Sequence, residues 1–172
     1  MIDRTYLPAA KLLPLILVLL IGCAAASTDA AGVQDIKRCE PVQKFLTESF
    51  AMVAVTERDT MDDWRTQKKL PGCRVTAAGG TSLGMTDTAE LLYDQMMAAG
   101  WTRTPDPRDA PAESALRLRW EETDCFFGVY TMATMAIGTE TERKVTMAFV
   151  PNHQDARYNV FVQCIPAMEA AP

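Results

Sequence analysis

An alternation of apolar and charged residues is the strongest constraint on the fold. Residues 116–121 read Leu-Arg-Leu-Arg-Trp-Glu, and residues 125–129 are again apolar at every second position. A period of two is typical of a strand with one buried face. We place the turn at Glu122–Thr123, which puts Trp120 opposite Cys125 and makes the apolar faces of the two strands coincide. The sequence therefore predicts a β-hairpin here.

Weaker patterns predict further elements on both sides of this hairpin. Apolar residues at helical spacing, a capping-box pattern and glycine stops predict helices, and apolar alternation predicts strands. The expected helices cover 41–53, 60–70 and 87–99, and the expected strands cover 73–78, 144–150 and 158–164. Residues 34–166 are thus predicted to form a single α+β domain, an antiparallel sheet of about four to five strands with helices packed on one face. Residues 167–172 are expected to be a frayed tail.

The amino-terminal segment has the features of an export signal. Arg4 and Lys11 give it a positive start, and residues 12–22 form an apolar run of the length of a signal h-region. A membrane span needs ~20 apolar residues, so this run is short for one. Residues 20–23, Leu-Ile-Gly-Cys, resemble the lipobox of bacterial lipoproteins. An ordinary signal peptide cut at Ala24–Ser27 is the alternative.

The resemblance to bacterial lipoproteins implies where the mature protein is located. Residues 1–22 would be removed, Cys23 would carry a diacylglycerol, and the new amino terminus would be acylated as well. Two or three acyl chains anchor a protein stably, with residues 23–33 as a short tether. In this family Ala24 resembles the case sorted to the outer membrane, so we expect a lipid-anchored domain that faces the periplasm.

The net charge of the chain argues against one class of partner. The whole chain has a formal net charge of −5, and loss of the signal removes more basic than acidic residues. An acidic domain lacks the positive surface that nucleic-acid binding requires. We therefore expect no nucleic-acid partner.

Four cysteines remain after Cys23, and an even number in an oxidising compartment implies two disulfides. Cys125 and Cys164 both fall on the predicted core face, and Cys39 and Cys73 bracket the first helical segments. We expect Cys39–Cys73 and Cys125–Cys164, with Cys73–Cys164 and Cys39–Cys125 as the second possibility. No metal or cofactor is expected, because CxxC spacing is absent and His153 is the only histidine.

One composition indicates a binding surface. The aromatic residues Phe126, Tyr130 and Phe161 lie on the predicted outer face of the sheet, beside Arg117 and Arg119. Aromatic residues with arginine are typical of protein interfaces. The alternative is that the N-terminal helix covers this face and makes these residues core.

Two functional hypotheses follow. The first is a non-catalytic, monomeric envelope lipoprotein that binds a protein or polymer partner. The second is an envelope hydrolase that uses carboxylates, which requires two acids ~5–9.5 Å apart in a cleft. Its candidates are Glu121, Glu122 and Asp124, which surround the predicted turn.

Overall fold

The computed structural model describes residues 35–63, 67–105, 115–132 and 136–168. The predicted signal, Cys23 with its tether, and the last four residues of the predicted tail lie outside these ranges. No helix in the described ranges is long and apolar enough to cross a membrane.

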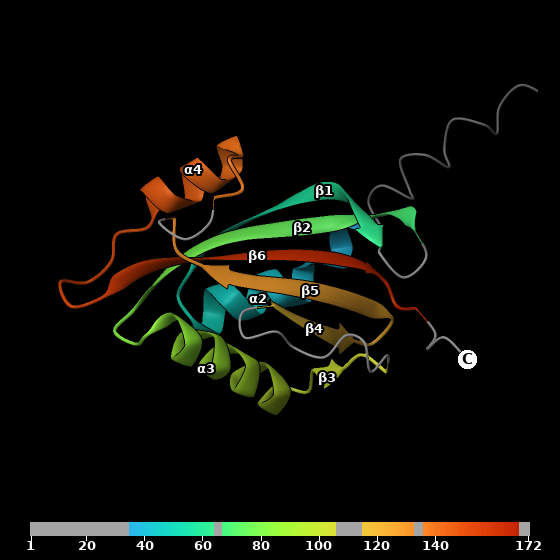
Figure 1. Cartoon of the computed structure of the whole chain (residues 1–172), viewed down its shortest axis with the longest axis horizontal. Coiled ribbons are helices and arrows are strands. Elements are labelled where there is room, and N and C mark those ends of the chain that lie inside the picture. Colours follow the sequence, from blue (N-terminus) through green and yellow to red (C-terminus); the bar gives the residue numbers. More distant parts are fainter. Residues whose placement is uncertain (1–34, 64–66, 106–114, 133–135, 169–172) are drawn as a thin grey trace, which may run out of the picture.

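The described strands form one antiparallel sheet in the order β1-β2-β6-β5-β4-β3 (Figure 1). The elements are α2 (Glu40–Ser49), β1 (Val53–Asp63), β2 (Lys68–Thr81), α3 (Met85–Ala98), β3 (Thr102–Arg103), β4 (Ala115–Trp120), β5 (Thr123–Tyr130), α4 (Glu140–Ala148) and β6 (Ala156–Pro166). The α+β class is confirmed, but the sheet has six strands rather than the predicted four to five.

The first correction concerns residues 41–63. Helix α2 ends at Ser49 rather than Val53, because Ala51 adopts a φ of 49° and turns the chain back. The described residues of the helix predicted from Thr60 are not helical, since residues 60–63 belong to β1 and residues 68–70 to β2, with Asp63 opposite Lys68. The long hairpin ladder outweighs the local capping-box pattern, which is a weak signal on its own.

The second correction concerns the strand predicted over 144–150. Residues 140–148 instead form α4, whose N-cap Thr139 accepts a hydrogen bond at Oγ1 from the backbone N–H of Glu142 at 3.1 Å. Thr139-Glu-Thr-Glu142 has the spacing of a capping box. This start signal overrides the apolar residues at the end of the segment.

The predicted hairpin is present, with a different register. The turn is Glu121–Glu122, so Trp120 pairs with Thr123 and Leu118 with Cys125. Glu121 has a φ of 49°, a left-handed conformation of the kind that tight two-residue hairpin turns use. The pairing differs from the prediction by two residues, and an even shift keeps each side chain on its face. The predicted faces therefore survive the error in register.

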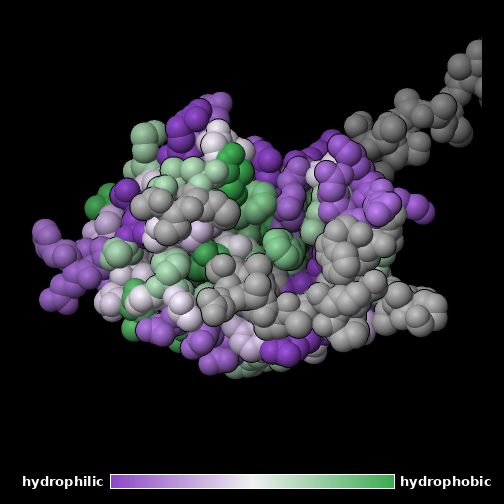
Figure 2. Space-filling view, viewed as in Figure 1, coloured by the Kyte–Doolittle hydropathy of each residue, from purple (hydrophilic) through white to green (hydrophobic). Residues whose placement is uncertain are grey.

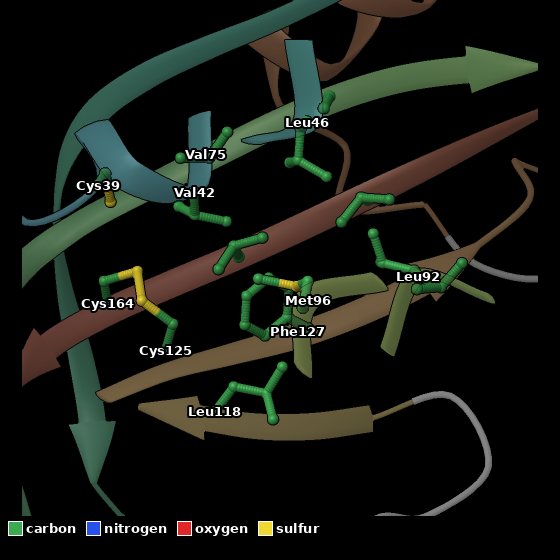
Figure 3. Close-up of a cluster of buried hydrophobic side chains, with 14 of the residues drawn as sticks. Cys39, Val42, Leu46, Val75, Leu92, Met96, Leu118, Cys125, Phe127 and Cys164 are labelled. Atoms are coloured by element: carbon green, nitrogen blue, oxygen red, sulfur yellow. A yellow bond between two sulfur atoms is a disulfide. The ribbon is translucent and has the colours of Figure 1, made fainter. Parts of the chain in front are cut away.

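Helices cover both faces of the sheet, not one face as predicted. Helices α2 and α3 pack on the face that carries the hydrophobic core (Figure 3). Helix α4 lies on the opposite face, where Asn159 Nδ2 of β6 donates to Thr146 Oγ1 of α4 at 2.9 Å. The largest of the core side chains come from both helices and all central strands: Val42, Leu46, Val75, Leu92, Met96, Trp101, Leu118, Phe127, Tyr158, Val160 and Val162.

Two disulfides reinforce one end of this core. Cys39–Cys73 ties the start of α2 to β2, with the Cα atoms 6.0 Å apart. Cys125–Cys164 joins residues that face each other on β5 and β6, with the Cα atoms 4.1 Å apart. The structure thus has the pairing that the sequence favoured, not the second possibility.

Adjacent leucines of α3 test which side of this helix packs on the sheet. Leu92 is fully buried, whereas Leu91 is 40% exposed. Leu92→Ala should lower the free energy of unfolding by ~2–5 kcal/mol through lost burial and a cavity. Leu91→Ala should cost far less. Urea unfolding followed by far-ultraviolet circular dichroism gives both values, and equal losses would contradict this orientation of α3.

Candidate functional site

The candidate site is the outer face of the sheet, defined as the face opposite α2 and α3. Strand register places Arg117, Phe126, Gln163, Arg74 and Glu57 in one row across β4, β5, β6, β2 and β1. Residues that face each other on neighbouring strands of an antiparallel sheet share a side of it. Two predicted interface residues, Arg117 and Phe126, are therefore direct neighbours.

The next row towards α4 is mostly apolar. It runs from Gly128 through Phe161 and Thr76 to Val55. Val55 is 38% exposed and Phe161 is half-buried, while Thr76 is buried. Figure 2 shows this side of the molecule, where green side chains lie below α4 and purple ones cover the far end of the β1–β2 hairpin. We call Val55, Phe126 and Phe161 the apolar strip.

Helix α4 covers the following row, and its anchor is a buried carboxylate. Glu142 is fully buried, and its carboxylate accepts a hydrogen bond from the Tyr130 hydroxyl. The backbone N–H groups of Ile137 and Gly138 donate to the same carboxylate at 3.1 and 2.7 Å. Glu142 therefore joins β5, the loop before α4 and the helix itself.

This contact shifts the pKa values of both partners. Burial would by itself raise the pKa of Glu142, but the hydrogen bonds from Tyr130, Ile137 and Gly138 outweigh burial and lower that pKa. Burial, then the hydrogen bond to Glu142 and its negative charge, raise the pKa of Tyr130 far above the ordinary value. The stable pair is accordingly a charged Glu142 and a neutral Tyr130.

Arginine–carboxylate contacts hold the other side of the outer face. Arg119 donates to both carboxylate oxygens of Asp124, at 2.6 and 3.0 Å, and to the backbone oxygen of Met168 at 2.6 Å. Arg74 donates twice to Glu57, at 3.0 and 3.1 Å. The Arg119–Asp124 pair is bidentate, which fixes the orientation of both side chains, whereas both Arg74 bonds go to one oxygen of Glu57.

A third arginine lies deeper. Arg117 Nη1 is 3.9 Å from Asp63 Oδ1, and both side chains are nearly inaccessible to solvent. Asp63 comes from the end of the edge strand β1, and Arg117 comes from β4, four positions away in the sheet order. Their pairing joins β1 to β4 at this end of the outer face. Removing one partner would leave the charge of the other buried without compensation.

These contacts change the status of the predicted interface residues. Tyr130 is buried under α4 and Arg117 is buried beside Asp63, so neither presents a free surface. Arg119 is held by Asp124. Phe126 and Phe161 are half-buried and remain partly accessible. The helix that covers part of this face is α4, whereas the sequence offered the N-terminal helix for that role.

Sequence reasoning missed Val55, the most exposed member of the apolar strip. The reason is the wrong boundary of the first helix, which extended to Val53 and removed β1 from the expected sheet. The residues 53–56, Val-Ala-Val-Thr, are rich in β-branched side chains that favour strands. That composition was the available signal.

The three carboxylates of the hydrolase hypothesis lie in different environments, two exposed and one buried. Glu121 and Glu122 are exposed and line a shallow pocket of about 440 Å³ together with Lys37, Arg38, Pro41, Trp120 and Thr123. Asp124 is buried, and its carboxylate is occupied by Arg119. The third acid is thus unavailable as a partner for the other two. The single histidine, His153, is exposed at a turn near Asp155.

No protein-family model, curated protein or solved structure matches this chain.

Two acids in the first turn of α4 test the anchor of this helix. Glu142→Gln removes the charge that three donors share and should lower the free energy of unfolding by about 1–3 kcal/mol at neutral pH. Glu140→Gln is the control, because Glu140 is 70% exposed and its carboxylate pairs with the exposed Lys144 at 2.7 Å. Hydrogen exchange of the amides of Ile137 and Gly138 should accelerate in the first variant alone.

The pH dependence follows from the lowered pKa of Glu142. Its stabilising contribution is present above the ordinary glutamate pKa of 4.5 and is lost as the pH falls through the lower folded-state value. The wild type should therefore lose more stability on acidification than Glu142→Gln does. Identical acid profiles from denaturant titrations would contradict a charged Glu142.

Proposed function

We propose that this chain is a lipid-anchored protein of the bacterial cell envelope, acylated at Cys23 and facing the periplasm from the outer membrane. The segment Leu20–Cys23 and the apolar run before it support export and acylation. Two disulfides between buried cysteines, Cys39–Cys73 and Cys125–Cys164, support an oxidising compartment. The domain would stay close to the bilayer on its short tether.

We propose further that the domain is a non-catalytic, monomeric binding module for a protein or polymer of the envelope. The observation that carries this is the apolar strip, which the fold leaves partly open. Val55 is 38% exposed on β1 and shares a row with the half-buried Phe161 two strands away, while the half-buried Phe126 lies in the adjoining row on β5. Aromatic side chains on a rigid surface supply contact area at a low entropic cost, which is typical of binding hot spots.

The surroundings of the strip support the same role. On one side it is bounded by α4, anchored through Glu142, and on the other by the contacts of Arg74 with Glu57 and of Arg119 with Asp124. A partner would therefore meet an apolar centre with a polar rim, which is the usual arrangement of an interface. The rim charges are already paired, so the apolar centre would contribute most of the affinity.

Photo-crosslinking in intact cells tests the binding surface directly. A photoreactive amino acid at position 55 samples the apolar strip, and the same group at position 91 samples α3 on the opposite side of the sheet. The two positions are matched, because Val55 is 38% and Leu91 is 40% exposed. We expect light-dependent adducts from position 55 and none from position 91.

The form of the adduct identifies the class of partner. A protein partner gives a discrete band of higher mass, and an envelope polymer gives a heterogeneous smear that a polymer-degrading enzyme removes. Phe161→Ser in the same background should abolish the adduct while far-ultraviolet circular dichroism remains unchanged. Equal adducts from both positions, or none from position 55, would contradict the binding surface.

A further inference from the structure

The four cysteines of the domain gather in one cluster at the end of the core, where Figure 3 labels Cys39, Cys125 and Cys164. Cys73 of β2 and Cys125 of β5 both face Cys164 of β6, one from each side. Cys39, the N-cap of α2, lies over this row and is bonded to Cys73. The two disulfides are therefore neighbours rather than separate staples.

The sulfur atoms of the cluster are close enough to change partners. The Sγ atoms of Cys39, Cys73 and Cys164 all lie within 4.8 Å of one another. Cys73 and Cys164 are opposite each other in an antiparallel pair, where Cα atoms are ~4.5–5.5 Å apart. Disulfides span Cα distances of about 4.4–6.8 Å. A Cys73–Cys164 bond therefore fits the existing backbone.

We propose that the two disulfides form a relay that exchanges through Cys73 and Cys164. A protein or small-molecule dithiol first reduces Cys39–Cys73, and the dithiol itself is oxidised to a disulfide by two electrons. The Cys73 thiolate then attacks Sγ of Cys164. The Cys73–Cys164 bond forms, the Cys164–Cys125 bond breaks, and its electron pair leaves on Cys125, which takes up a proton.

The position of Cys39 supports the first step of the relay. Cys39 caps the amino terminus of a ten-residue helix, whose dipole favours negative charge on the sulfur that leaves. Its chain neighbours Lys37, Arg38 and Pro41 line the pocket that also contains Trp120. This pocket is the route by which a dithiol would approach. Cys39 is itself fully buried, so reduction requires the start of α2 to move.

The relay goes beyond the proposed binding role and does not depend on the lipid anchor. It assigns the central position to Cys164, which among the described cysteines is the one whose direct cross-strand neighbours on both sides are cysteines. Either neighbour can hold it in a disulfide, and the other is then available as the attacking thiol. The buried cluster thus places two disulfides next to each other, so that a thiol released from one can attack the other.

Disulfide mapping of Cys39→Ser tests the exchange. This variant leaves Cys73 as a thiol next to Cys125–Cys164. The full chain is purified without reductant, its thiols are alkylated at low pH, and its linked peptides are identified by mass spectrometry. Among the cysteines of the folded domain, we expect both Cys73–Cys164 and Cys125–Cys164 peptides, with the alkyl label divided between Cys125 and Cys73. A single Cys125–Cys164 linkage, with all label on Cys73, would overturn the relay, as would a bond between Cys73 and Cys125.

Two further measurements distinguish exchange in the folded protein from misfolding of the variant and from disulfide scrambling during handling. The double variant Cys39→Ser with Cys73→Ser must give only Cys125–Cys164. In the unaltered protein, treatment with less than one equivalent of dithiothreitol should produce the Cys73–Cys164 peptide before both original linkages are lost. Loss of the two original linkages without that peptide would count against the relay even if every variant folds.

Discussion

The insertion of β6 between β2 and β5 is the interaction on which the rest of the structure depends. The chain builds two separate antiparallel units, β1–β2 and β3–β5, and only the last strand joins them into one sheet. Its ladders with β2 and β5 extend over nine and eight residue pairs. Because these contacts are far apart in the sequence, the sheet can be completed only when the carboxyl-terminal strand is in place, as is usual for folds with non-local pairing. Cys164 lies in this strand and is covalently held to β5.

The two faces of this sheet have different physical tasks. The inner face is apolar, and Leu92, Met96, Val42 and Leu46 of the helices pack against it. The outer face is held by charge: Glu142 attaches α4, and arginine–carboxylate pairs hold the opposite side. The carboxylates of Glu142 and Asp124 are buried, so loss of their donors would leave buried charges without compensation. Between them the apolar strip remains partly open, and this division of labour is the basis of the proposed binding role.

The sequence predicted the features that depend on local pattern. It failed where the secondary structure depends on pairing with a distant strand. The alternation around Trp120, the helix before Gly100 and the residues that share a face with Cys125 needed only neighbouring residues, and they were found. Residues 60–63 were assigned to a helix, because their strand state depends on β2, which the pattern did not extend that far. Because β1 was missing from the predicted sheet, Val55 was not recognised as a residue of the outer face. The depth of Arg117 was also unpredictable, since its partner Asp63 is distant in the chain and reaches it only through the completed sheet.

The proposed lipid anchor and the two disulfides each change the mass of the chain, so intact-mass measurement tests both in one sample. Protein from the membrane fraction is weighed before and after reduction. We expect loss of residues 1–22, a mass gain that matches acylation at Cys23, and a rise of about 4 Da on reduction from two hydrogens per disulfide. A soluble, unacylated chain with four free thiols would contradict the anchor, the compartment and the disulfide cluster together.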